Sequence, residues 1–321
     1  MIKRDSSLIE DIDPKLFKFA KYDEETAEKT GYSDYSYWLS TCQIFSKNKL
    51  AMTLLGILCV LLIFTFIQPH LPGQKKPTEI FINVETGMPE RNHRPSKEFW
   101  IGTNSIGQDL WARLWGGVRT SMFIGIVVAT WDIVMGTIIG AIWGYVRKLD
   151  PIITEIYNVI HNIPDTIILV LVSYILRPSL STIIIAMCIT GWLPTARFVR
   201  NQIVIIRDRE YNLASRCLGT PTRRLIIKNI LPYLVSVITL RFALAIPGAI
   251  GREVFLTYIG LGLPVSIPSL GNLINEGRVV MMSPSLRYQL IYPSIVLSII
   301  TISFYVIGNC FADASDPKNH V

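Results

Sequence analysis

The stretch EYNLASRCLGTPTRRLIIKNILP, residues 210–232, decides the fold because it predicts a polar helical hairpin between two apolar segments. Apolar residues recur at helical spacing within 213–218, which indicates a first short helix. Gly219 follows the last of them, at the usual place of a left-handed helix cap. Thr220 then suits an N-cap, and Pro221 suits the first position of a second helix that runs to the next proline. The sequence therefore predicts a short, rigid helix held across one end of a helix bundle.

The composition places this hairpin in a membrane protein. Half of the 321 residues are hydrophobic, only 17% are charged, and the mean hydropathy is +0.39. A soluble domain usually carries about 25% charged residues. The formal net charge of +7 does not indicate nucleic acid, because the basic residues fall in loops between apolar runs, where orientation signals belong.

Six apolar stretches are long enough to cross a bilayer, since about 20 apolar residues span roughly 30 Å of hydrocarbon. Glycine and proline inside several of them are ordinary in membrane helices. The sequence therefore predicts an all-α, polytopic membrane protein with six transmembrane helices. The predicted spans are 50–68 and about 120–145, 152–176, 182–205, 233–257 and 288–311.

Basic residues indicate how these spans are oriented. They gather in the short loop 146–151 and in the segment 206–232, whereas the short links on the other side carry few. By the positive-inside rule, both termini and the hairpin lie in the cytoplasm. The segment 69–119 then lies outside, and it is long enough to form a small structured cap.

This topology divides the chain into four parts. A secretory signal would need its apolar core nearer the start, so the first apolar run is an uncleaved membrane anchor. Before it, Tyr35, Tyr37 and Trp38 suggest an amphipathic piece on the membrane surface, which serves either as a brace or in regulation. The predicted parts are a cytoplasmic segment 1–48, a first helix with an extracellular cap 49–119, a five-helix core 120–311 with the hairpin helix at 210–224, and a cytoplasmic tail 312–321.

Catalytic and nucleotide-binding motifs are absent from the sequence. There is no GxxxxGK[ST], HExxH or GxSxG, and no acid pair at catalytic spacing in a soluble domain. There is also no obvious repeat between the halves, which disfavours a self-sufficient secondary transporter. The sequence indicates a chain that is not an enzyme and has no cofactor or metal of its own. The cysteines form no CxxC pair and are interpreted as small apolar residues: Cys42, Cys59, Cys188, Cys217 and Cys310.

The hairpin resembles a known loop. In ABC importer permeases the EAA loop has the pattern Glu-Ala-Ala, three residues, Gly, nine residues, Ile, one residue and Leu-Pro. Ala214, Gly219, Leu231 and Pro232 stand at the spacing of this pattern. The resemblance implies a type I ABC importer permease fold in which this helix is the coupling helix.

The chain departs from the pattern at Leu213, Ser215 and Asn229, which replace the Glu, the second Ala and the Ile. In that family the coupling helix docks in a groove of a cytoplasmic ATPase, a helix-in-groove interaction that suits an apolar stripe beside an arginine. The resemblance assigns ATPase coupling to Glu210, Tyr211, Asn212, Ala214, Ser215, Arg216, Leu218, Gly219, Thr220 and Pro221.

Three further stretches resemble the peptide/nickel branch of these permeases. They are WIGTNSIGQDLWARLWGGVRTSM at 100–122, FLTYIGLGLPVSIPSLGNLI at 255–274 and ADASDP at 312–317. In the first of them, Asn104 and Gln108 stand where Asp and Arg are usual. The resemblance is closest to the second, C-type permease subunit of Gram-positive oligopeptide importers.

Ionisable residues inside membrane spans are expensive and are therefore candidate functional residues. Counted from the span ends at about 1.5 Å per residue, Asp132 and Arg241 both lie some 12 Å from the cytoplasmic face. One hypothesis is that they pair across the bundle. The alternative is that each faces a water-filled passage alone.

Four other charged or titratable residues are candidates for the translocation pathway. His161 and Asp165 flank Pro164 in the third span, where the proline is expected to kink the helix. They suit a polar lining of the passage better than a proton relay. Arg252 and Glu253, near the outer end of the fifth span, either meet a peptide terminus or rest at the interface.

The resemblance implies a permease subunit of an ATP-driven oligopeptide importer in the plasma membrane. The implied partners are a second homologous permease, two cytoplasmic ABC ATPases that use ATP and Mg, and a lipid-anchored extracellular binding protein that delivers the peptide. A dipeptide or nickel/metallophore importer subunit is the alternative within this class. A peptide-gated receptor or channel is an alternative from another class, and a membrane enzyme using His161 and Asp165 is the weakest one. Substrate length and sequence preference cannot be read from these residues.

Overall fold

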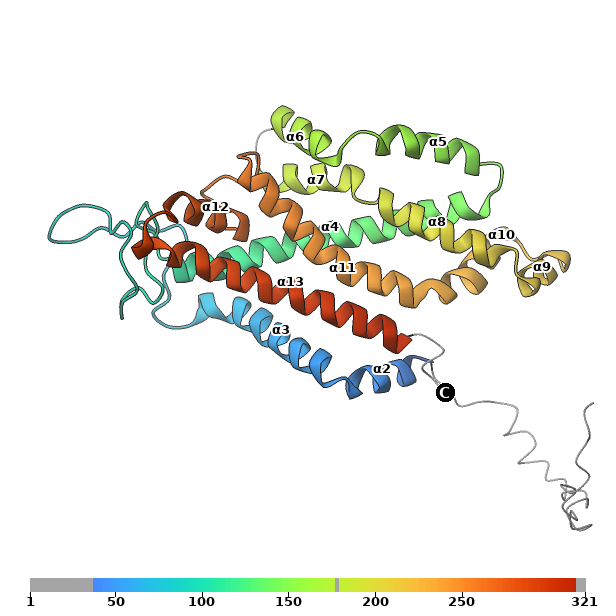
Figure 1. Ribbon diagram of the computed structural model, residues 1–321, viewed down its shortest axis with the longest axis horizontal. Coiled ribbons are helices and arrows are strands. Elements are labelled where there is room, and N and C mark those ends of the chain that lie inside the picture. Colours follow the sequence, from blue (N-terminus) through green and yellow to red (C-terminus); the bar gives the residue numbers. More distant parts are fainter. Residues whose placement is uncertain (1–36, 177–178, 316–321) are drawn as a thin grey trace, which may run out of the picture. The chain divides into compact units, whose positions relative to one another are not determined.

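The computed structural model describes residues 37–176 and 179–315 (Figure 1). The chain from Thr41 onward forms one unit, distinct from Met1–Ser40. The expectations for most of the segment 1–48, including Tyr35, and for the end of the predicted tail, 316–321, lie outside the described residues.

The described chain is helical, as predicted, with only isolated bridges between extended residues. All five cysteines are free thiols. In chain order the elements are α2 (Tyr37–Lys47), α3 (Lys49–Ile67), η3 (Gln68–His70), α4 (Leu110–Tyr145), α5 (Asp150–His161), α6 (Asp165–Ile175), α7 (Leu180–Thr190), α8 (Leu193–Arg207), α9 (Glu210–Cys217), α10 (Thr222–Leu225), the π turn η4 (Ile226–Ile230), α11 (Leu231–Tyr258), α12 (Leu270–Val280), η5 (Pro284–Leu286) and α13 (Tyr288–Ser315).

The prediction of six membrane spans is confirmed, with one span broken. By length and composition, five helical segments in the described residues can cross a membrane, and a sixth span is formed if α5 and α6 are taken together. These two helices meet at an angle of 71° at the break that contains Pro164. The proline was expected to kink this span, and its missing N–H explains why the helix cannot continue through it.

Several helices extend beyond the predicted spans. The second span begins at Leu110 instead of about residue 120, because Asp109 caps α4 by accepting a hydrogen bond from the Ala112 N–H at 2.9 Å. The last helix reaches Ser315, so the tail predicted from residue 312 begins inside α13. The fourth span is divided into α7 and α8 at Gly191.

Helix α4 runs through the middle of the bundle and packs against α8 and α11 (Figure 1). Gly136, Gly140 and Gly144 recur every four residues on the side of α4 that faces α8. A Cβ atom at any of the three would lie within 3 Å of an atom of α8, so the two backbones approach as closely as small residues allow. This glycine stripe makes α4 and α8 one rigid pair.

The two ends of the bundle are built differently (Figure 1). At one end the chain between α3 and α4, residues 71–109, forms turns and isolated bridges such as Ile80 with Gln108; we call this segment the cap. At the other end α9 and α10 form the predicted hairpin between α8 and α11. The fold therefore offers a cap end and a hairpin end for separate tasks.

Candidate functional site

The hairpin has the predicted shape around its glycine. Gly219 takes a φ of +79°, the left-handed conformation expected of a helix cap, and the Thr220 N–H donates to the Ser215 carbonyl at 3.1 Å. Pro221 lies just before α10, one position earlier than predicted, so α10 begins at Thr222. The turn between the two short helices is thus fixed by hydrogen bonds and by a residue that readily takes positive φ.

The prediction that the second helix stops at Pro232 is wrong. The helical run continues from α10 through the π turn η4 into α11, and Pro232 lies in the first turn of α11. A proline ring clashes with the carbonyl four residues earlier in an ordinary α-helix, and the wider π turn removes this conflict. The hairpin is therefore joined to the fifth span without an interruption.

Helix α9 buries a polar residue and exposes apolar side chains beside the charged Glu210 and Arg216. Asn212, which sequence reasoning left off the apolar stripe, is buried and donates its amide hydrogen to the Ile206 carbonyl at 3.0 Å. Tyr211, Leu213 and Leu218 are 50%, 42% and 86% exposed. This arrangement is the reverse of an ordinary surface helix, and exposed apolar side chains of this kind indicate a surface for a partner.

Asp208 ties the hairpin to the ends of the long helices. Its carboxylate contacts the guanidinium groups of Arg147 at 2.9 Å, Arg207 at 3.3 Å and Arg216 at 3.5 Å. Arg207 also donates to the Gly144 carbonyl of α4 at 2.6 Å, and Arg216 donates to the Arg207 carbonyl at 2.8 Å. We call this set of residues the arginine hub. The arginine hub therefore links α9 to the adjoining ends of α4 and α8.

The charges of the arginine hub shift the titration of its central acid. Burial acts to raise the pKa of Asp208, but hydrogen bonds from Arg207 and Arg147 outweigh it and hold the pKa below its ordinary value. Asp208 is 41% exposed, so each of these ion pairs is weak and sensitive to salt.

The hypothesis that Asp132 pairs with Arg241 is wrong. Asp132 instead forms an ion pair with Arg252, with 3.0 Å between its Oδ2 and the arginine Nη2. Arg241 lies over the ring of Phe198, with its guanidinium carbon 4.1 Å from the ring centroid. The depth estimate failed because it assumed that both spans end at the membrane surface, whereas α4 and the run into α11 extend past the predicted ends.

Three of the six predicted pathway residues line one cavity between the helices. Asp132, Arg241 and Arg252 border a space of about 310 Å³, together with residues of α8 and α11. We call it the charged cavity. It lies in the part of the bundle whose helices are long and apolar enough to cross a membrane. Its other lining residues are Gly191, Pro194, Thr195, Leu244, Ala245 and Gly248.

The other three predicted pathway residues lie elsewhere. Glu253 is fully buried and accepts hydrogen bonds from Ser121 at 3.1 Å and Thr257 at 3.2 Å, so it faces the interior instead of a passage or an interface. His161 stacks on the ring of Tyr157, and Asp165 begins α6 across the bend. Within the described residues, no hydrogen bond joins His161 to Asp165.

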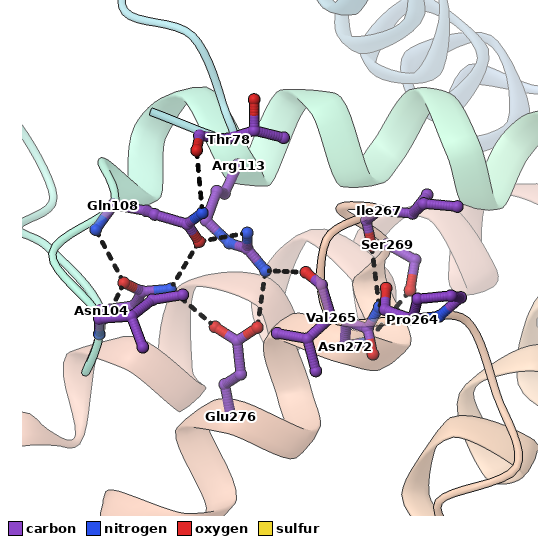
Figure 2. A network of polar contacts seen from close by, with 11 residues as sticks. Thr78, Asn104, Gln108, Arg113, Pro264, Val265, Ile267, Ser269, Asn272 and Glu276 are labelled. Carbon is purple, nitrogen blue, oxygen red and sulfur yellow. Dashed lines mark hydrogen bonds and ion pairs between the residues drawn. The ribbon is translucent and has the colours of Figure 1, made fainter. Parts of the chain in front are cut away.

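The cap end contains a buried polar network that sequence reasoning missed (Figure 2). Arg113 of α4 is completely buried and forms an ion pair with Glu276 of α12 at 2.6 Å. The other Glu276 oxygen accepts from the Asn104 amide at 3.0 Å, and Gln108 accepts from both Arg113 and Asn104. Arg113 also donates to the Val265 carbonyl at 3.3 Å. The cap, α4 and the chain around α12 are thus held together by one network.

Helix α12 itself was not predicted, since it lies between the fifth and sixth predicted spans, where the sequence analysis proposed no helix. The local signal was present: Ser269 caps the helix by accepting from the Asn272 N–H at 3.0 Å. The Asn272 side chain in turn donates to the carbonyls of Pro264 and Ile267, which fixes the approach to the helix (Figure 2).

A bundle of membrane-capable helices, with a charged cavity between them and a helical hairpin at one end, defines a multi-pass membrane protein. Two family models match the chain: "Binding-protein-dependent transport system inner membrane component" over residues 136–321, and "N-terminal TM domain of oligopeptide transport permease C" over residues 36–85. The chain therefore belongs to the family of inner membrane components of binding-protein-dependent transport systems.

Named relatives match over nearly the whole chain. The oligopeptide transport system permease protein AmiD of Streptococcus pneumoniae is 37% identical over 96% of this chain and 99% of its own length. The oligopeptide transport system permease protein OppC of Bacillus subtilis is 34% identical over 97% of this chain and 99% of its own length. The dipeptide transport system permease protein DppC of Bacillus subtilis is 36% identical over 88% of this chain and 86% of its own length.

Proposed function

We propose that this chain is the permease subunit of an ATP-driven oligopeptide importer and forms half of its translocation pathway. The observation that carries the proposal is the hairpin, which exposes Tyr211, Leu213 and Leu218 while contacts of Asp208 and Asn212 hold α9 to the bundle. A helix that exposes a docking surface and is bound to the bundle suits the transmission of a movement from a soluble subunit to the membrane helices. The two oligopeptide transport permeases among the relatives support oligopeptides as the substrate class.

In this proposal the hairpin faces the cytoplasm, as the excess of basic residues around it favours. Two P-loop ATPases bind ATP and Mg²⁺ and dock on the hairpins of this chain and of a homologous second permease. A lipid-anchored binding protein delivers the peptide to the outer face, where the cap lies. The complex is in the plasma membrane, with both termini of this chain in the cytoplasm.

The first test is to purify the tagged chain gently from its native membrane and to identify the co-purifying proteins by mass spectrometry. We expect a second permease and two ATPases in stable proportion. Leu218→Asp places a charge at an 86% exposed apolar position and should release the ATPases. The matched control is Val84→Asp, at a 99% exposed apolar position in the cap, which should retain them. A chain that purifies alone or as a homo-oligomer would contradict the proposal.

A dipeptide importer is the second candidate, because the dipeptide permease of Bacillus subtilis is about as similar to this chain as the oligopeptide permeases are. Uptake of labelled dipeptides and pentapeptides by cells that contain the complex separates the two. Uptake of dipeptides but not of pentapeptides would assign dipeptides as the substrate class. Peptide uptake that survives ATP depletion would favour a channel.

A further inference from the structure

The charged cavity has more positive than negative groups. Its lining contains two arginines, Arg241 and Arg252, and one acid, Asp132. Arg252 is neutralised by Asp132 at 3.0 Å. Arg241 has only the aromatic face of Phe198, and no acid in the described residues forms an ion pair with it. Arg241 is exposed in this chain, so its guanidinium is accessible to an anionic group.

Asp132 acts in this cavity as the partner of Arg252. Its Oδ2 accepts a hydrogen bond from Arg252, and its Oδ1 is buried, with both oxygens packed against Gly191. The Asp132 side chain is only 4% exposed. Arg241 is therefore the charged group that remains for a bound anion.

One face of α11 lines the space between the two arginines. Arg241, Ala245, Gly248 and Arg252 follow one another at helical spacing, with about 16 Å along the helix axis between the arginines. A Cβ atom added at Gly248 would meet nothing within 4 Å. Packing within this chain therefore does not require a glycine there, and the absence of a side chain keeps the space between the arginines open.

We propose that the charged cavity binds the carboxylate of the transported peptide. Arg241, which is exposed in this chain and has no acid of its own, binds the carboxylate. A planar guanidinium matches a carboxylate in a bidentate geometry, and charge-assisted hydrogen bonds are stronger than neutral ones. At about 310 Å³ the cavity suits the end of a chain better than a whole oligopeptide.

A terminal carboxylate is present on every free peptide, so this site would serve substrates of any sequence. An acidic side chain offers the same chemistry, and the experiment below distinguishes the two sources. The inference rests on the proposed function, because it assigns a substrate subsite to the importer.

The test uses the complete complex in proteoliposomes with ATP and the binding protein. The rate of uptake is measured for labelled penta-alanine and for its C-terminal amide, each at a concentration that saturates the binding protein. We expect the wild type to transport the acid about tenfold faster than the amide, as one charge-assisted contact allows. Arg241→Gln should slow the acid to the rate of the amide and leave the amide nearly unchanged, and Arg241→Lys should keep part of the preference.

The matched control is Arg278→Gln. Arg278 is exposed and lies over the Tyr258 ring at 4.1 Å, the same stacking distance as in Arg241, but outside the charged cavity. This variant should keep the preference for the acid. If Arg241→Gln does not assemble, Gly248→Leu provides a second variant, because the open space at Gly248 accepts the side chain while the passage is filled. It should slow both peptides at least about tenfold while assembly is retained.

An equal fall for acid and amide in Arg241→Gln, or a wild type without any preference, would overturn the inference and leave the importer proposal intact. Failure of the wild type to take up any peptide with ATP would instead overturn the proposed function. A third probe, the amide of Ala-Ala-Glu-Ala-Ala, identifies the source of the carboxylate. Uptake as slow as that of penta-alanine amide assigns the site to the terminal carboxylate. Uptake as fast as that of penta-alanine with a free carboxylate assigns it to acidic side chains.

Discussion

The cap end and the hairpin end both depend on an arginine–carboxylate contact, but the two contacts lie in opposite environments. At the cap end, Arg113 is 0% exposed and Glu276 16% exposed. At the hairpin end, Arg147 and Asp208 are 66% and 41% exposed. The cap end thus holds the charges of this contact inside the chain, whereas the hairpin end leaves them partly in water. Both ends expose apolar side chains, among them Val84 in the cap and Leu218 in the hairpin.

The largest expected effect is at the cap end. Arg113→Ala leaves Glu276 without its buried partner and should lower the free energy of unfolding by about 3–5 kcal/mol. The thermal midpoint in detergent measures this, with the exposed Arg278→Ala as control, expected within about 0.5 kcal/mol of wild type. A double substitution of Arg113 and Glu276 by methionine should recover part of the loss. Equal midpoints for Arg113→Ala and wild type would remove the contrast between the ends.

The next effect concerns the glycine stripe that runs between the two ends. A Cβ at Gly140 would lie 2.8 Å from the Val199 Cβ, and closer still to the Ala196 carbonyl. Gly140→Leu should therefore separate α4 from α8 and lower the unfolding free energy by about 1–3 kcal/mol or more. Gly56→Leu is the control, because a Cβ there meets nothing within 4 Å. A Gly140→Leu protein as stable as this control would show that the close approach is not needed.

A smaller effect on stability, but a specific one on coupling, is expected at the hairpin. Asn212→Ala removes the amide that bonds the Ile206 carbonyl and should cost about 1 kcal/mol. Because α9 is then held less firmly, less peptide should enter per ATP hydrolysed by the reconstituted complex. The exposed Asn201→Ala on α8 serves as control. An unchanged ratio of peptide imported to ATP hydrolysed would mean that Asn212 does not help to hold α9 in place for coupling.

The smallest effect comes from the arginine hub. The pKa of Asp208 is below its ordinary value in the folded protein. The contribution of its ionised carboxylate to stability is therefore complete above about pH 4 and is lost as the pH falls further. A spin label on Cys217, with the other cysteines replaced, should show unchanged mobility of α9 from pH 8 to 5 and greater mobility below about pH 4. In the Asp208→Asn protein, α9 should be mobile at every pH. High salt should reduce the difference in α9 mobility between this variant and the wild type. Equal mobility in both proteins at pH 7 would contradict this role.

The sequence predicted the features that depend on neighbouring residues. The spans follow from apolar length, the bend from Pro164, and the turn of the hairpin from Gly219, the natural residue for a φ of +79°. Helix α12 was missed although Ser269 supplied its N-cap, because a short helix that follows a glycine- and proline-rich stretch is easily taken as part of a connection.

Contacts between distant residues could not be predicted in this way. Arg113 and Glu276 are 163 residues apart, and Asp132 and Arg252 are 120 apart. Only the crossing of the helices decides which charges meet. Asn212 was misjudged for a related reason: a polar residue is assumed to face water until the structure shows which carbonyl its side chain reaches.

The π turn η4 has a consequence for the geometry of the whole fifth span. Each residue of an α-helix turns the following face by about 100°, and a π turn accommodates one residue more per turn than an α-helix. The five residues of η4 therefore set the angular phase between the hairpin and everything that follows in α11. If the same residues were wound as a regular α-helix, the extra residue would rotate the face that carries Arg241 and Arg252 by about 100° away from its present direction. The direction in which these arginines point is thus encoded in a segment that lies well before them in the chain.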